Sequence, residues 1–207
     1  MRPIGLEDVL GRERYGAERD AIRHRIIAHK RTRRVAVGDR LSFLFEDQAT
    51  IWYQTQEMLW IEHITDLDAI REELAVYNEI LPGPGALSAT LLIEIEDRSG
   101  LREELNRLIG IDEHVTLEVD GELGVAAAFE AGRQTAEKLS AVQYVRFPLA
   151  AEARRRIAAG SPLALEVAHP NYRVRAPLPE AVRASLAADL ADPAAAEEAL
   201  RRVRDGG

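Results

Sequence analysis

The sequence predicts an α+β protein in which N-terminal helices pack on a largely antiparallel sheet and an Ala-rich helix follows. Helical patterns dominate residues 1–81, and strand patterns dominate residues 87–170. The strands come in hairpins and clusters and do not alternate with long helices, which favours an antiparallel arrangement over a doubly wound one. We therefore expect one α+β domain over residues 1–177 and a C-terminal helical appendage over residues 178–207.

The first part of the chain is expected to hold a short helical turn, a helix and a hairpin. Residues 6–10 form the turn, and residues 14–30 contain helix-forming residues throughout. Residues 35–47 show apolar alternation on both sides of the pair Gly38-Asp39, which is typical of a hairpin.

The segment TIWYQTQEMLWIEH, residues 50–63, predicts a helix that ends near Ile64. Each of its helical stripes mixes apolar and polar side chains, whereas a simple surface helix would separate them. Such a helix is flanked on more than one side, so some of Gln54, Glu57 and Glu62 are expected to be buried and to need partners.

A second helix follows directly. Thr65 is expected to be its N-cap, with Asp68 three residues later, and the helix runs to about Asn78. The breaker cluster PGPG, residues 82–85, stops it and is read as a turn.

The second half of the chain reads mainly as strands. A long strand is expected over residues 87–97, followed by a short helix over residues 101–108 that Gly110 stops. The clearest hairpin signal surrounds Asp120-Gly121. Further strands are expected in SAVQYVRFPL and PLALEVAH, separated by a helix over residues 150–159. From Pro179 onward the chain is expected to be helical, with a break at Asp192-Pro193.

The composition limits the possible classes of protein. Hydrophobic residues make up 46% and charged residues 30%, which is typical of a soluble globular protein. No apolar run is long enough to cross a membrane, and the first residues lack the apolar core of a signal peptide, so we expect a cytoplasmic protein. Because the chain has no cysteine, it can hold no disulfide, thiolate metal site or iron–sulfur cluster of its own.

No motif names a reaction. The phosphate-binding glycine loops and the nucleophile elbow are absent. Candidate catalytic carboxylates are Glu46, Glu57, Glu62 and Glu94, because a pair of carboxylates with separated pKa values can perform acid/base catalysis.

A metal site has weak support from spacing. The chain has no Glu-x-x-His pair, and adjacent residues such as Glu62 and His63 lie about 100° apart on a helix. The weak candidate ligands are Glu57, Glu62, His63 and His169, which would have to converge from separate elements. The sequence does not identify a cofactor.

The competing interpretation is a structural polar network. It would consist of Gln54, Glu57, Glu62, Arg33, Arg34, Tyr77 and Asn78, with Glu57 or Glu62 paired to Arg31, Arg33 or Arg34.

The segment from Arg19 to Arg34 is strongly basic, although the net charge of the chain is −8. It could bind nucleic acid, but no aromatic residues are interleaved with its cations, so a solvated helix face is the simpler interpretation and nucleic acid is an unlikely partner.

Three blocks of the sequence resemble the DUF3501 family of bacterial proteins: RRVAVGDRLSFLFED, TIWYQTQEMLWIE and EELAVYNEILPGPGALSATLLIEIED. The resemblance covers about residues 14–150. Trp60 departs from the family pattern, which has a basic residue there, so no charged role is carried over to it. The matching positions are Arg33, Arg34, Gly38, Phe45 and Glu46 in the first block, Thr50, Gln54, Glu57, Met58 and Glu62 in the second, and Glu73, Tyr77, Asn78, Pro82, Ala89, Thr90 and Glu94 in the third.

The resemblance implies an accessory role, because genes of this family often lie beside those for rubrerythrin-like proteins and iron–sulfur oxidoreductases. It suggests a non-catalytic interaction component of a redox or peroxide-defence system, with those proteins as partners and a homo-oligomer as a further possibility. The alternatives are a small metal-dependent or acid/base enzyme centred on Glu57 and Glu62, and a nucleic-acid-binding regulator that uses Arg19–Arg34.

Overall fold

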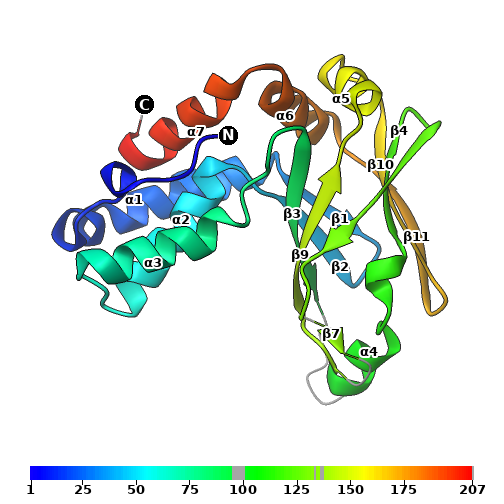
Figure 1. Cartoon of the computed structure of the whole chain (residues 1–207), viewed down its shortest axis with the longest axis horizontal. Coiled ribbons are helices and arrows are strands. Elements are labelled where there is room, and N and C mark those ends of the chain that lie inside the picture. Colours follow the sequence, from blue (N-terminus) through cyan, green and yellow to red (C-terminus); the bar gives the residue numbers. More distant parts are fainter. Residues whose placement is uncertain (95–100, 133, 136–137, 207) are drawn as a thin grey trace. The chain divides into compact units, whose positions relative to one another are not determined.

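The structure is a computed structural model that describes residues 1–94, 101–132, 134–135 and 138–206 (Figure 1). Within these residues it contains seven α-helices and two larger antiparallel sheets, which confirms the predicted α+β class. No helix in these ranges is long and apolar enough to span a membrane.

The chain divides into two compact units. The helical unit comprises residues 1–32, 46–84 and the chain from Asp192 onward, and the strand-rich unit comprises residues 33–45 and 85–191. The prediction of a single domain over residues 1–177 with a separate helical appendage stays a prediction.

The helical unit is built around one central helix. Its elements are the 3₁₀ turn η1 (Leu6–Asp8), α1 (Arg12–Lys30), α2 (Gln48–Ile61), α3 (Leu67–Asn78) and α7 (Pro193–Asp205). Helix α2 contacts α1, α3 and α7, as Figure 1 shows. The apolar and polar groups on several faces of α2 therefore have neighbours on several sides, as its mixed stripes predict.

The starts of α2 and α3 are set by aspartate caps. Asp47 caps α2, and its carboxylate accepts a hydrogen bond of 2.9 Å from the Thr50 N–H. The predicted cap of α3 is wrong by one residue, because Asp66 and not Thr65 accepts from the first-turn amides. The charge of Asp66 interacts favourably with the positive helix end, which a threonine hydroxyl does less well. Helix α2 ends at Ile61, before the predicted Ile64.

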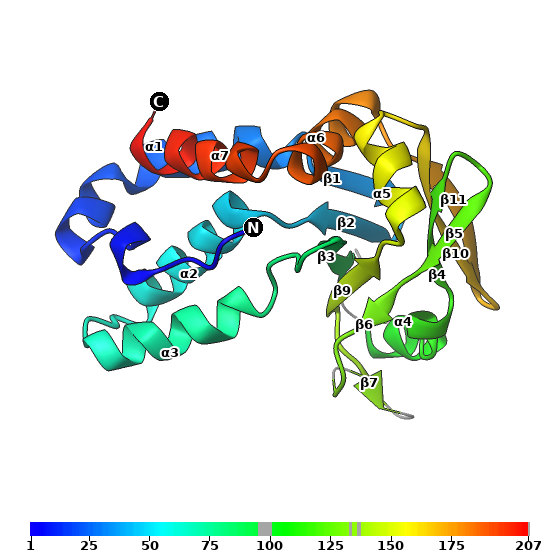
Figure 2. The ribbon, with the colours of Figure 1, turned by 45° about the horizontal axis from the view of Figure 1, so that its top comes forward.

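The strand-rich unit contains two antiparallel sheets (Figures 1 and 2). The first has the order β1 (Arg34–Val37), β2 (Leu41–Phe45), β3 (Ala86–Ile93), β9 (Val142–Pro148) and β6 (Ala128–Phe129). The second has the order β11 (Tyr172–Pro177), β10 (Leu163–His169), β4 (Val115–Val119) and β5 (Leu123–Ala126). A short pair is formed by β7 (Gln134–Thr135) and β8 (Lys138–Leu139), and the unit also contains α4 (Leu101–Arg107), η2 (Ile111–Glu113), α5 (Ala151–Ala158) and α6 (Glu180–Ala191).

The core of this unit consists of inward-facing residues from both sheets. Phe43 and Leu91 of the first sheet and Leu117 and Leu165 of the second are fully buried in one cluster. Alternation along strands such as β4, with the burial pattern of alternating buried and half-buried residues, places the apolar residues on one face of the sheet. Residues 95–97, which complete the predicted long strand, lie outside the described residues.

The predicted hairpins are confirmed. Asp120 and Gly121, in the turn between β4 and β5, both have positive φ, of 60° and 69°, as a type I′ turn requires. Strand β11 lies outside the predicted strands, although its sequence YRVRAP alternates apolar residues with arginines at exposed positions.

Candidate functional site

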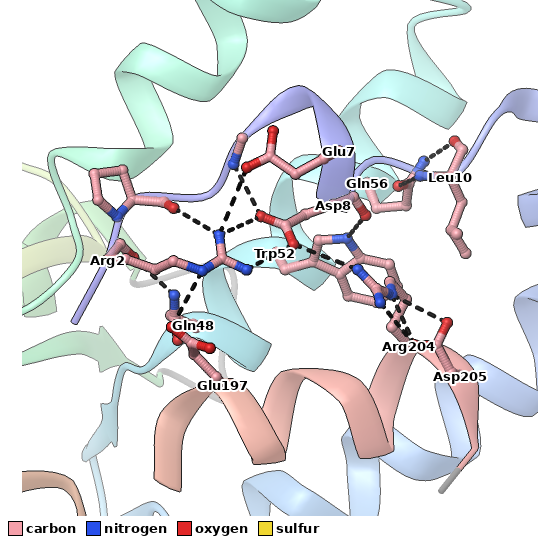
Figure 3. A network of polar contacts seen from close by, with 12 residues as sticks. Arg2, Glu7, Asp8, Leu10, Gln48, Trp52, Gln56, Glu197, Arg204 and Asp205 are labelled. Atoms are coloured by element: carbon pink, nitrogen blue, oxygen red, sulfur yellow. Dashed lines mark hydrogen bonds and ion pairs between the residues drawn. The ribbon is translucent and has the colours of Figure 1, made fainter. Parts of the chain in front are cut away.

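The N-terminal segment of the helical unit is held by side chains that bind its backbone (Figure 3). Gln48, Trp52 and Gln56 are spaced by four residues and so lie on one face of α2. Trp52 Nε1 donates to the carbonyl of Asp8 at 2.9 Å. Gln56 Oε1 accepts from the N–H of Leu10 at 2.9 Å, and its Nε2 donates to the same residue's carbonyl at 3.0 Å.

Two more amide side chains continue this pattern. Gln48 Nε2 donates to the carbonyl of Arg2 at 2.7 Å. Asn78, at the end of α3, accepts from the N–H of Ile4 at 2.8 Å and donates to its carbonyl at 3.0 Å. Tyr77, beside it, is half-buried. These bonds satisfy backbone groups of a segment that has little secondary structure of its own.

A buried carboxylate ties the same segment to the C-terminal helix. Asp8, only 3% exposed, accepts two hydrogen bonds from Arg2, of 2.7 and 2.9 Å, and lies 3.4 Å from Arg204 (Figure 3). Burial raises the pKa of Asp8, but the hydrogen bonds from Arg2 and the Gly5 N–H outweigh it and hold the pKa below its ordinary value.

A pocket of about 270 Å³ lies between this segment, the start of α1, the end of α2 and the start of α3. Aliphatic side chains make up most of its walls. Its rim includes Leu67, which is 57% exposed. The aliphatic lining residues are Leu6, Val9, Leu10, Leu59, Ile64, Leu67 and Ile70.

Trp60 and Arg12 also line the pocket and touch one another. The Arg12 guanidinium lies 4.2 Å from the centre of the Trp60 ring, and its Nη1 donates to the Trp60 carbonyl at 2.9 Å. Gly16 makes room for the indole, since a Cβ at this position would lie 2.7 Å from the ring.

Glu57, the first candidate for catalysis, is used in an ion pair. Arg19 donates to both of its carboxylate oxygens, at 2.8 and 2.7 Å, and the Tyr15 hydroxyl donates at 2.5 Å. The bonds from Arg19 and Tyr15 lower the pKa of Glu57, although partial burial opposes them. The arginine comes from α1 and not from residues 31–34 as expected, because α1 packs alongside α2.

Glu46 and Glu94 belong to different units. Glu46 is 2% exposed and lies 3.3 Å from the Gln54 amide in the helical unit. In the strand-rich unit, Glu94 accepts from Ser42 at 2.6 Å and from Arg34 at 3.3 Å. The carboxylate of Glu94 is largely exposed, so this pair lies at the surface of its unit.

The remaining candidates are separate from Glu57. Glu62 caps the end of α2 and is exposed, and exposed His63 follows it with a φ of 56°. The buried His169 ring contacts the Ile109 carbonyl through Nε2 at 3.0 Å and the Asn171 N–H through Nδ1 at 3.2 Å. Across the described ranges, no group of three or more His, Asp or Glu side chains is placed to hold a metal ion.

Several cations of the basic segment have structural contacts. Arg25 donates to the carbonyls of Val203 and Arg204 at the end of α7. In the strand-rich unit, Arg33 is 1% exposed and bonds to Asp189, Ser185 and the carbonyl of Phe45. Arg19 and Arg34 also bind partners within the chain. Fewer cations of the segment are therefore available to a ligand than the number of basic residues in its sequence implies.

Sequence patterns do not identify the residues that line the pocket. Arg12 lies outside the predicted helix over residues 14–30, and Leu6 and Leu10 are predicted only as part of a short turn. The spacing of Gln48, Trp52 and Gln56 was a usable signal, because polar groups repeated every four residues on a buried helix need partners on one side.

Comparison with known proteins assigns a family. A family model described as "Protein of unknown function (DUF3501)" matches residues 3–190, which confirms the predicted resemblance. A crystal structure described as a novel protein of unknown function from Burkholderia pseudomallei K96243 is similar to this chain, with 41% sequence identity and a TM-score of 0.86. The alignment covers 91% of this chain and 99% of that one. No curated protein matches the sequence.

Proposed function

We propose that this chain, which belongs to the DUF3501 family, is a non-catalytic interaction component of a redox or peroxide-defence system. It would dock a partner protein through the pocket of its helical unit. The gene association that the family resemblance implies makes a rubrerythrin-like protein and an iron–sulfur oxidoreductase the first partners to test.

The observation that carries the proposal is the apolar pocket beside Trp60. An engineered cavity of about 150 Å³ is large enough to bind benzene. A pocket of about 270 Å³ therefore has room for a large apolar side chain. Apolar anchors that fill such pockets supply much of the binding energy of protein interfaces.

The walls of the pocket are also bonded to neighbouring residues. The Leu10 wall is bonded to Gln56, and the ring of Trp60 is supported by Gly16 and Arg12. A pocket that exists before binding reduces the entropy lost on association.

The proposal is tested with two exposed apolar residues of α3. Leu67 is 57% exposed and lines the pocket, whereas Val76 is 61% exposed and does not line it. We expect Leu67→Asp to weaken binding of the purified partner at least tenfold by isothermal titration calorimetry, and Val76→Asp to leave it unchanged.

The proposal would be contradicted if the chain bound neither partner protein, or if both variants bound the partner equally well. A third contradicting result can come from light scattering, which measures whether the chain forms a dimer. If the chain alone forms a dimer that Leu67→Asp dissociates, a second copy occupies the pocket and the role as a docking site for another protein is wrong.

A further inference from the structure

We propose that the pocket recognises the C-terminal residue of the partner chain, with an apolar side chain in the pocket and its terminal carboxylate bound to Arg12. This inference rests on the proposed docking function and adds the chemistry of the docked group. It starts from the charge of Arg12.

Arg12 differs from Arg2, Arg19 and Arg204, which pair with acids, and from Arg25, whose guanidinium donates to the carbonyls of Val203 and Arg204 at the end of α7. Arg2 and Arg204 pair with Asp8, and Arg19 pairs with Glu57. Arg12 has no carboxylate within ion-pair distance among the residues that the structure describes, although Asp and Glu outnumber Lys and Arg by 35 to 27 in the chain. A guanidinium held against a pocket wall without an acid is suited to an acid brought by a ligand.

The position of the guanidinium favours a planar anion. One of its N–H groups donates to the Trp60 carbonyl, and its stacking on the indole restricts its movement. Its other donors can bind a carboxylate in the two-bond geometry that arginine favours. Gly11, the N-cap of α1, lines the same pocket without a side-chain cap, so the positive helix end adds to the potential there.

The charges near the pocket argue for a single carboxylate and not for an acidic segment. Glu7, Asp66 and Asp68 are exposed, and each is next in the sequence to a residue that lines the pocket. They would repel a partner segment that carries several acids. A chain terminus with an apolar last residue offers one negative charge next to one apolar side chain, and recognition of terminal carboxylates is an established mode of peptide binding.

The test uses N-acetyl-L-leucine and N-acetyl-L-phenylalanine as probes, each compared with its C-terminal amide. The two compounds of a pair differ only in the charged group. Binding is followed by the NMR signals of the two indole N–H groups. Trp60 lines the pocket, whereas the N–H of Trp52 is buried and bonded to Asp8, so Trp52 serves as the internal reference.

We expect the acids to shift the Trp60 signal and to bind at least about tenfold more tightly than the amides, because a charge-assisted hydrogen bond is lost in the amide. Arg12→Gln should make the acid and the amide bind equally. The matched control is Arg14→Gln, since Arg14 lies on the same helix but is exposed, pairs with Glu18 and does not line the pocket.

The outcomes separate this inference from the proposed function. Equal binding of acid and amide to the unmodified chain would overturn the carboxylate assignment, as would an acid preference that survives Arg12→Gln. The proposed docking function would still be supported in that case if Leu67→Asp weakened partner binding. The absence of any shift at Trp60 would overturn the inference as well.

Discussion

The two compact units are stabilised by different kinds of contact. In the strand-rich unit, apolar residues such as Phe43, Leu117 and Leu165 alternate into one core. In the helical unit, Gln56 and Asp8 are each 3% exposed, and they bond to the Leu10 backbone and to Arg2, respectively. The helical unit also buries apolar residues such as Ile22, Ile26 and Ile51, but it adds buried polar pairs between residues far apart in the sequence.

This difference has an energetic consequence. Removal of part of an apolar core costs free energy in proportion to the cavity that remains. Removal of one partner from a buried polar pair costs more than the pair contributed, because the other partner stays desolvated. The helical unit should therefore be sensitive to the loss of buried polar side chains, and the strand-rich unit should depend less on them, with one exception.

That exception is Arg33, where the largest effect is expected. The Arg33→Ala variant leaves the Asp189 carboxylate in the strand-rich unit without its guanidinium. We expect the free energy of unfolding to fall by about 3–5 kcal/mol, measured by urea denaturation at pH 7. A loss of this size would show that the strand-rich unit also contains an essential polar pair.

The neighbouring Arg34 is the control. Its pair with Glu94 is exposed on both sides, so Arg34→Ala should cost less than about 1 kcal/mol. Equal losses in the two variants would mean that burial does not determine the contribution of these arginines.

The second largest effect is expected at Gln56. The Gln56→Ala variant removes two hydrogen bonds to the Leu10 backbone, and we expect it to lower the free energy of unfolding by about 1–3 kcal/mol. The amide of Leu10 should also exchange its hydrogen faster, because it loses its acceptor.

Gln54→Ala is the matched control on the same helix. Its contacts are longer, at 3.3–3.4 Å, and its side chain is half-buried, so a loss below about 0.5 kcal/mol is expected. If Gln54→Ala were the more destabilising variant, the backbone bonds of Gln56 would not be what holds the N-terminal segment.

The smallest effect is expected at Glu57, and it depends on pH. The bonds from Arg19 and Tyr15 stabilise the ionised carboxylate, so the pKa of Glu57 is lower in the folded chain than its ordinary value of 4.5. This contribution is complete above the ordinary pKa and is lost as the pH falls through the lower, folded pKa. Glu57→Gln should therefore be less stable than the unmodified chain by about 1 kcal/mol at pH 7, and the difference should shrink as the pH is lowered below 4.5.

Thermal unfolding of both proteins at neutral and acidic pH measures this difference. A constant difference across the series would show that the charge of Glu57 contributes nothing to stability and that its role is only steric.

Local patterns were enough to predict much of the fold. The alternation in residues 35–47 and the pair Asp120-Gly121 predict hairpins that the structure contains. The α3 cap was misplaced because Thr65 and Asp66 are both residue types that cap helices. Strand β11 lies outside the predicted strands although its apolar residues Tyr172, Val174 and Ala176 alternate with polar positions, which is a usable strand signal.

The candidate site was less accessible to such reasoning. The mixed stripes of residues 50–63 predicted that Gln54 and Glu57 need partners, and both have them. The expected burial of Glu62 is not observed, since Glu62 lies at the exposed end of α2. Glu57 and Glu62 lie five residues apart, so their carboxylates lie on different sides of the helix.

The sequence by itself determined the family, the α+β class and the hairpins, because each depends on residues close together in the chain. Only the tertiary structure decided that Arg19 neutralises Glu57, that Gln56 holds Leu10 and that Arg12 meets Trp60 at a pocket. Those pairs join residues 38 to 48 positions apart, and their formation depends on how α1, α2 and the N-terminal segment pack together.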